Sequence, residues 1–95
     1  MQLDILTPER KLYSGDITSV EMPGIDGYFG ILSNHAPMIS ALKAGKITVE
    51  QVKAMQPSED AIDTFIEDAQ NKRFSLDVKG GVVEVFHNKV IVLLD

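Results

Sequence analysis

Three side chains close together in the sequence have the types that hydrolases use. Ser33, His35 and Asp26 supply a hydroxyl, an imidazole and a carboxylate, the groups of a nucleophile, its base and the residue that orients the base. Neither a strand–turn–helix elbow around a serine nor a glycine-rich phosphate loop before a helix accompanies them. A small hydrolase that uses His35 is therefore a weaker interpretation than His35 as a structural or contact residue of an exposed loop.

The residue types for a metal or cofactor site are equally sparse. The chain has no cysteine, and its two histidines, His35 and His87, are far apart in the sequence. The acidic residues of 59–68 lack the alternating oxygen donors and central glycine of a calcium loop, so they indicate a solvated surface. We expect no catalytic residue, no metal and no cofactor.

Composition narrows the class of protein further. The 95 residues carry a net charge of −5, whereas a nucleic-acid partner requires a basic surface to neutralise phosphates. No apolar run approaches the roughly 20 residues that span a bilayer. The sequence therefore predicts one small globular domain over residues 1–95, with no nucleic-acid binding and no direct membrane insertion.

Short apolar runs separated by glycine, proline, asparagine and aspartate predict an all-β fold. Phe74–Lys79 alternates between apolar and polar residues, the period of a half-buried strand. Gly80 and Gly81 then predict a bend, and two β-branched runs joined across His87 and Asn88 predict a hairpin. The other expected strands are Leu3–Leu6, Lys11–Tyr13, Asp16–Met22, Tyr28–Leu32, Met38–Lys43 and Lys46–Val52.

Two details of the first half are expected to interrupt regular pairing. Ser14 and Gly15 predict a turn between Lys11–Tyr13 and Asp16–Met22. Ile17 is out of phase with Val20 and Met22, which predicts a β-bulge. Seven or more short strands at this spacing indicate a sandwich or a barrel.

The acidic segment near residues 57–72 departs from the strand pattern. Ser58 could cap a helix, and an apolar stripe at helical spacing follows, formed by Ile62, Phe65, Ile66 and Ala69. This pattern predicts a short amphipathic helix from about Glu59 to Asn71. An extended acidic loop is the alternative.

The segment Gly24–Pro37 combines glycines, adjacent aromatic residues, an Asn-His pair and a terminal proline. It is either a corner between two sheets, with Tyr28 or Phe29 in the core, or a rigid loop presented to a partner. The aromatic pair also leaves open a stand-alone sandwich that binds peptide or carbohydrate.

Five motifs in order resemble the N-terminal domain of the epsilon subunit of bacterial F-type ATP synthases. They are Leu6–Gly15, Val20–Gly24, Gly27–Pro37, Ala41–Gly45, and Lys79–Val85 together with Asn88–Val90. The resemblance implies a β-sandwich of two five-stranded sheets, about ten short strands in all. It also implies a non-catalytic central-stalk subunit that links the gamma subunit to the c-ring and helps couple proton translocation to ATP synthesis.

The resemblance further implies contact residues for the two partners. The residues at positions that face the c-ring in the family are Gly27, Tyr28, Phe29, Gly30, Asn34, His35, Ala36 and Pro37. Those at positions that face gamma are Thr7, Lys43 and Lys46. The implied location is peripheral, at the cytoplasmic face of the bacterial plasma membrane.

The chain departs from the family pattern in three places. Tyr28 stands where the family usually has glutamate, and the segment between Val52 and Phe74 is longer than in most members. The chain stops at Asp95, the usual border of the sandwich. We therefore expect the family's C-terminal two-helix domain to be absent, and assign neither inhibition of hydrolysis nor ATP binding to this chain.

Overall fold

The computed structural model describes residues 1–52, 66–68 and 73–95. These residues form nine strands. The strands are β1 (Gln2–Leu6), β2 (Lys11–Gly24), β3 (Gly27–Leu32), β4 (Met38–Leu42), β5 (Gly45–Gln51), β6 (Ile66–Asp68), β7 (Arg73–Val78), β8 (Gly81–Phe86) and β9 (Lys89–Leu94). The predicted all-β sandwich is confirmed.

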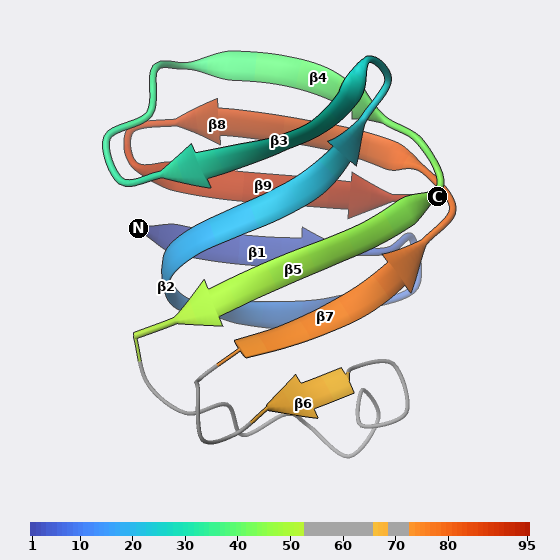
Figure 1. The fold of residues 1–95 in the computed structure, drawn as a ribbon, viewed down its shortest axis with the longest axis horizontal. Coiled ribbons are helices and arrows are strands. Elements are labelled where there is room, and N and C mark those ends of the chain that lie inside the picture. The colour runs from blue at the N-terminus through green and yellow to red at the C-terminus, as the bar shows by residue number, and fades with distance from the viewer. Residues whose placement is uncertain (53–65, 69–72) are drawn as a thin grey trace.

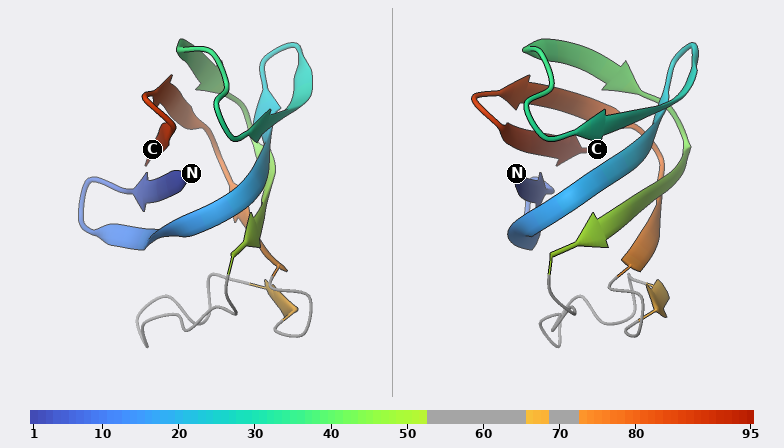
Figure 2. Two further views of the ribbon diagram at one scale, coloured as in Figure 1. Left: turned by 90° about the vertical axis from the view of Figure 1, so that its left-hand side faces the viewer. Right: turned by 60° about the vertical axis from the view of Figure 1, so that its left-hand side comes forward.

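Two layers of strands face each other across the core (Figures 1 and 2). One layer has the order β1-β9-β8-β4, and the other has the order β3-β2-β5-β7-β6. The 14-residue strand β2 belongs to both layers, because its first half pairs with β1 and its second half pairs with β3 and β5. One long bent strand therefore joins the two sheets.

Strict alternation places one side of each strand in the core. Ile47 and Val49 of β5 and Phe74 and Leu76 of β7 are at most 1% exposed, while the residues between them face outward. The remaining core residues with at most 1% exposure are Leu3, Ile5, Ile17, Val20, Met22, Ile31, Val83, Val85, Val90 and Val92. This pattern is the one expected when two half-buried sheets pack face to face.

Several local predictions are confirmed by the backbone. The register between β2 and β5 shifts between Ile17 and Ser19, where the sequence predicts a bulge. His87 and Asn88 both have positive φ, 51° and 59°, as a two-residue type I′ hairpin turn requires. At Gly81 an added Cβ would collide with the Leu93 carbonyl oxygen, so the glycine permits the bend before β8.

Two local predictions are wrong. Ser14 and Gly15 lie within the continuous strand β2 and form no turn. Ile66–Asp68 is a strand that pairs with β7 and is not part of a helix. The other residues of the predicted helix lie outside the described part of the chain.

The core ends at a polar pair between β2 and β5. The Tyr13 hydroxyl donates a 2.7 Å hydrogen bond to Oε1 of Gln51, whose side chain is buried at 7% exposure. Its Nε2 has no hydrogen-bond partner among the residues that the structure describes. Because an unmade hydrogen bond in a buried site is costly, this pair is a sensitive point of the fold.

We expect Tyr13→Phe to lower the free energy of unfolding by about 1–3 kcal/mol, since it leaves a second polar atom of Gln51 unpaired. Combining it with Gln51→Leu should recover most of that loss, because no buried amide then remains. Urea unfolding of the two single variants and the double variant measures this coupling. Additive effects would contradict the assignment.

The raised pKa of Tyr13 predicts a loss of folding stability at alkaline pH. Burial, and next the nearby Asp16 carboxylate, raise the pKa of Tyr13 to about 12. The unfolded chain ionises this phenol near pH 10, so the contribution of Tyr13 to stability is intact below pH 10 and falls as pH rises toward 12. Unfolding at pH 8 and pH 11 should show this loss in the wild type, and a smaller one in Tyr13→Phe.

Candidate functional site

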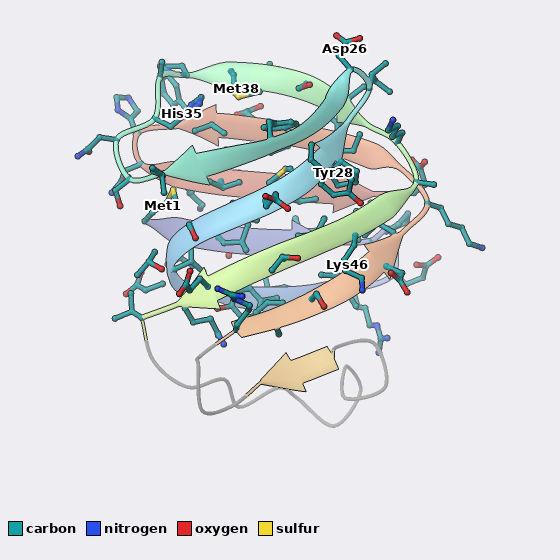
Figure 3. The ribbon with its side chains drawn as sticks, in the orientation of Figure 1. Met1, Asp26, Tyr28, His35, Met38 and Lys46 are labelled. Atoms are coloured by element: carbon teal, nitrogen blue, oxygen red, sulfur yellow. The ribbon has the colours of Figure 1, made fainter. Side chains whose placement is uncertain are left out.

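The segment expected to face the c-ring, Gly27–Pro37, consists of strand β3 and the link to β4. Tyr28 lies near the start of β3, and His35 lies beyond its end. Most of β3 separates them, and the Ser33–Asn34 turn follows before His35. Figure 3 shows the two side chains well apart, with His35 at the left-hand end of the molecule and Tyr28 right of its centre.

Tyr28 packs back onto the start of β5. Its hydroxyl accepts a 2.9 Å hydrogen bond from the Lys46 backbone N–H. A Cβ at Gly45 would lie 2.7 Å from both the Tyr28 hydroxyl and Cβ of Pro23, so glycine is needed for this approach. The structure therefore brings Tyr28, expected to face the c-ring, directly against Lys46, expected to face gamma.

The other residues expected to face gamma lie toward the same end of the sandwich. The Lys43 N–H donates to the Pro23 carbonyl oxygen at 2.9 Å. Thr7 begins the β1–β2 link, where its N–H donates to the Arg10 carbonyl at 2.8 Å and its Oγ1 accepts from the Arg10 N–H at 3.2 Å. These bonds hold both links in fixed conformations.

The residues that follow Tyr28 along β3 lie on alternate faces of the sheet. Phe29 packs against the core, whereas Gly30 is exposed on the outer face. Gly27 has a φ of 134°, which favours glycine after the Ile25–Asp26 turn. The two adjacent aromatic rings therefore belong to opposite faces of the sheet.

The link Ser33–Pro37 is tied to the β8–β9 turn. The Asn34 N–H donates a 2.9 Å bond to Oδ1 of Asn88, and the His35 N–H donates to the Leu32 carbonyl at 3.2 Å. Nδ1 of His35 lies 2.7 Å from the Ala36 carbonyl oxygen, which can only accept. Nδ1 therefore carries the hydrogen, and Nε2 remains available for a partner.

The candidate hydrolase residues do not meet. Asp26 lies in the β2–β3 turn and His35 in the β3–β4 link, at opposite ends of β3 (Figure 3). Within the described ranges, no three His, Asp or Glu residues are grouped so that they could hold a metal ion. In the same ranges no helix has the length and apolar character to cross a bilayer.

The outer face of the β1-β9-β8-β4 sheet carries an apolar row that was not among the expected sites. Leu6 pairs with Leu93, Leu93 with Val82, and Val82 with Ala41. Leu93 is 52% and Val82 41% exposed, and Ile39 on the same face is 72% exposed. We call these five residues the apolar face.

A signal for the apolar face is present in the sequence. The run Val90–Leu94 is apolar without alternation, which is typical of a strand covered on both sides. Only one side of β9 is covered by the described chain, where Val90 and Val92 are fully buried. A contiguous exposed apolar surface of this kind marks a protein–protein contact.

Polar and charged groups border the apolar face on the side of strand β1. The Asp4 carboxylate accepts a 2.6 Å bond from the Ser14 hydroxyl and lies 3.6 Å from the Lys89 ammonium. The Ser14 hydrogen bond, followed by weaker contributions from Gln2 and Lys89, lowers the pKa of Asp4 against the opposing effect of burial. An apolar centre with a charged rim is the usual anatomy of an interface.

Comparison with known proteins identifies relatives of the whole chain. The family described as ATP synthase, Delta/Epsilon chain, beta-sandwich domain matches residues 1–95. The ATP synthase epsilon chain of Chlorobium limicola is 38% identical over 99% of this chain and 88% of its own length. That of Desulforamulus reducens is 37% identical over 99% of this chain, which spans 58% of that relative.

Solved structures show the same fold. A chain of the Tetrahymena thermophila mitochondrial ATP synthase central stalk and c-ring aligns with a TM-score of 0.75 at 11% identity, covering 99% of this chain and 62% of that chain. A chain of the Euglena gracilis mitochondrial ATP synthase aligns with a TM-score of 0.73 at 16% identity, covering 97% and 48%. With the full-length family match and the bacterial relatives, these findings establish that the chain belongs to the ATP synthase delta/epsilon chain family.

Proposed function

We propose that this chain is a non-catalytic central-stalk subunit of an F-type ATP synthase, linking the gamma subunit to the c-ring. In this role it helps couple proton translocation to ATP synthesis, and residues 1–95 act as one sandwich domain. Membership of the delta/epsilon chain family supports the role. The observation that carries it is the apolar face, a surface suited to permanent contact with another subunit.

The apolar face is the docking surface for gamma. It offers an uncharged centre of four in-register residues with Asp4 and Lys89 at its border. Thr7, expected to face gamma, directly follows Leu6 of the row. Lys43 and Lys46 remain predictions for the same partner.

The tip of the β2–β3 hairpin, at the Ile25–Asp26 turn, is the contact for the c-ring. Ile25 in its turn is 58% exposed and Tyr28 is 54% exposed, and the Lys46 amide holds Tyr28 in place. Asn34, His35, Ala36 and Pro37 follow the other end of β3 and remain predictions for a c-ring contact.

Mechanical coupling requires a stiff element between the two contacts. The sandwich has a continuous core of residues at most 1% exposed, and close-packed cores have low compressibility. Its side chains make and break no bonds in this role. The relatives in Chlorobium and Desulforamulus are bacterial, which supports a peripheral location at the cytoplasmic face of the plasma membrane.

The peptide- or carbohydrate-binding alternative loses its support. It rests on Tyr28 and Phe29 as a joint platform, but Phe29 packs on the core and the Tyr28 hydroxyl is bonded to the Lys46 amide. The hydrolase alternative fails because Asp26 and His35 lie apart.

Co-purification of the full chain with gamma and the c-ring tests the proposed function. We expect a stable complex in which the chain is retained through gel filtration. An assembled synthase that makes ATP at the full rate without this chain would overturn the proposal.

A further inference from the structure

Strand β3 has a free edge. It pairs with β2, and no other described strand pairs with it. Gly24 pairs with Gly27 around the two-residue turn, so the hydrogen-bonded pairs on this hairpin fall at Gly27, Phe29 and Ile31. The N–H and C=O groups of Tyr28, Gly30 and Leu32 therefore point away from β2, toward the free edge.

This edge lacks the usual protection against strand pairing. Proteins block exposed edges with charged residues or proline, yet Gly27–Leu32 contains neither. Tyr28 is 54% and Leu32 66% exposed. The edge is therefore competent to accept a further strand.

Gly30 has no explanation within the described chain. The glycines with positive φ are Gly27, Gly80 and Gly81, so the backbone of Gly30 does not require glycine. A Cβ on Gly30 would fit without strain, its nearest neighbour being the Val20 carbonyl oxygen at 3.9 Å, an ordinary contact distance. A glycine inside a strand without an internal reason is typical of a site where another backbone or side chain approaches.

The missing side chain opens a hollow on the outer face of the β3-β2-β5-β7 sheet. The hollow has a volume of about 310 Å³, and its lining includes Gly30, Leu32, Glu21, Glu50 and Arg73. Glu50 lies 3.8 Å from Arg73, whereas Glu21 takes part in no ion pair among the described residues. The hollow therefore offers an unpaired carboxylate.

The register of β2 and β3 indicates which kind of side chain would fill the hollow. Glu21 lies directly across from Gly30, so a residue added beyond Gly30 is two strand spacings, about 10 Å, from Glu21. Only a long side chain crosses that distance, and a basic one complements the carboxylate. A second copy of this chain would present Gly30, Glu21 and Glu50 again, and like charges would oppose it.

We propose that an extended segment of the gamma subunit, and not the c-ring expected at Gly30, adds a strand to the free edge of β3, with a lysine or arginine that passes over Gly30 to Glu21. This inference rests on the proposed function. Ile39 of the apolar face lies on β4, which pairs with β8 along its length and with β2 only at Leu42, and β3 and β4 run along the same side of the molecule (Figure 2). A gamma segment leaving the apolar face therefore reaches β3 by crossing β4.

Amide hydrogen exchange in the complex of the full chain with gamma tests the added strand. In the isolated chain, the Phe29 and Ile31 amides should exchange slowly and the Tyr28 and Gly30 amides fast. In the complex, the Tyr28 and Gly30 amides should slow at least about tenfold. A stable complex in which both amides keep their fast rates would overturn the inference and leave the proposed function intact.

Two variants test the hollow. Gly30→Val should keep the unfolding midpoint or raise it, because valine favours strands, while gamma affinity falls about tenfold or more. Glu21→Lys should weaken binding similarly, whereas Asp16→Lys, an equal charge change on the same strand outside the hollow, should not.

Unchanged affinity in both test variants would overturn the inference, as would slow Tyr28 and Gly30 amides caused by self-association of the isolated chain. Failure of gamma to bind the wild type would overturn the proposed function as well.

Discussion

Leu93→Lys is expected to weaken the affinity of the chain for gamma by about thirtyfold or more, while the chain stays folded. Leu93 lies at the centre of the apolar row, between Leu6 and Val82. A charge there must be desolvated when gamma docks, and truncating or charging a central interface anchor costs about 2 kcal/mol or more. Because Leu93 is 52% exposed in the free chain, the free energy of unfolding should change little.

Titration of gamma with wild-type and variant chains measures this effect. Val52→Lys is the matched control, since Val52 is 47% exposed and lies beyond the end of β5, outside the apolar face. Equal affinities for Leu93→Lys and Val52→Lys would show that gamma does not dock on the apolar face.

Phe74→Ala is expected to reduce the free energy of unfolding by about 3–5 kcal/mol. Phe74 is 1% exposed and is the largest of the fully buried side chains. Its ring lies 4.8 Å from that of Tyr13, so the truncation also removes the support of the Tyr13–Gln51 pair. A small domain is stable by only about 5–15 kcal/mol, so this one change removes a large share.

Urea unfolding compares this variant with Phe86→Ala. The chemical change is identical, but Phe86 on β8 is 53% exposed. We expect a cost below about 1 kcal/mol for the exposed phenylalanine. Similar midpoints for both variants would mean that the core beneath β5 and β7 is not packed as the structure shows.

Local sequence patterns predicted the strands and turns whose burial or backbone conformation restricts the residue types directly. The alternation at Phe74–Lys79 is visible in the sequence because one face of β7 is buried and the other exposed. The hairpin at His87 and Asn88 was predictable because few residues accept positive φ. The bulge near Ile17 appears as a loss of phase, which the pairing of β2 and β5 confirms.

Other sequence patterns gave wrong predictions because the same residue type is compatible with two kinds of structure. Gly15 suggested a turn, but it leaves room for a neighbour: a Cβ there would lie 2.7 Å from the Tyr13 hydroxyl. Ile66 fits a helical apolar stripe, but Ile66–Asp68 pairs with Ser75, Phe74 and Arg73 of β7. Tertiary pairing overrides local propensity in such short segments.

The sequence named residues for the candidate site but not their arrangement. The contact roles of Tyr28, His35 and Lys46 stay predictions, and the motifs did not indicate that Tyr28 would touch Lys46 or lie far from His35. These relations depend on pairing between strands distant in the sequence, which no local pattern specifies. The apolar face was missed because its row combines Leu6, Ala41, Val82 and Leu93 from four strands.

The parallel pairing of β1 with β9 has a consequence for biosynthesis. Gln2 pairs with Lys89 and Leu6 with Leu93, so β1 waits for β9, which is synthesised much later, before this ladder is complete. Contacts of such long sequence separation form slowly. The nascent chain therefore leaves the exit tunnel with an open sheet edge, and a chaperone that covers β1 during translation would protect the subunit from aggregation until β9 emerges.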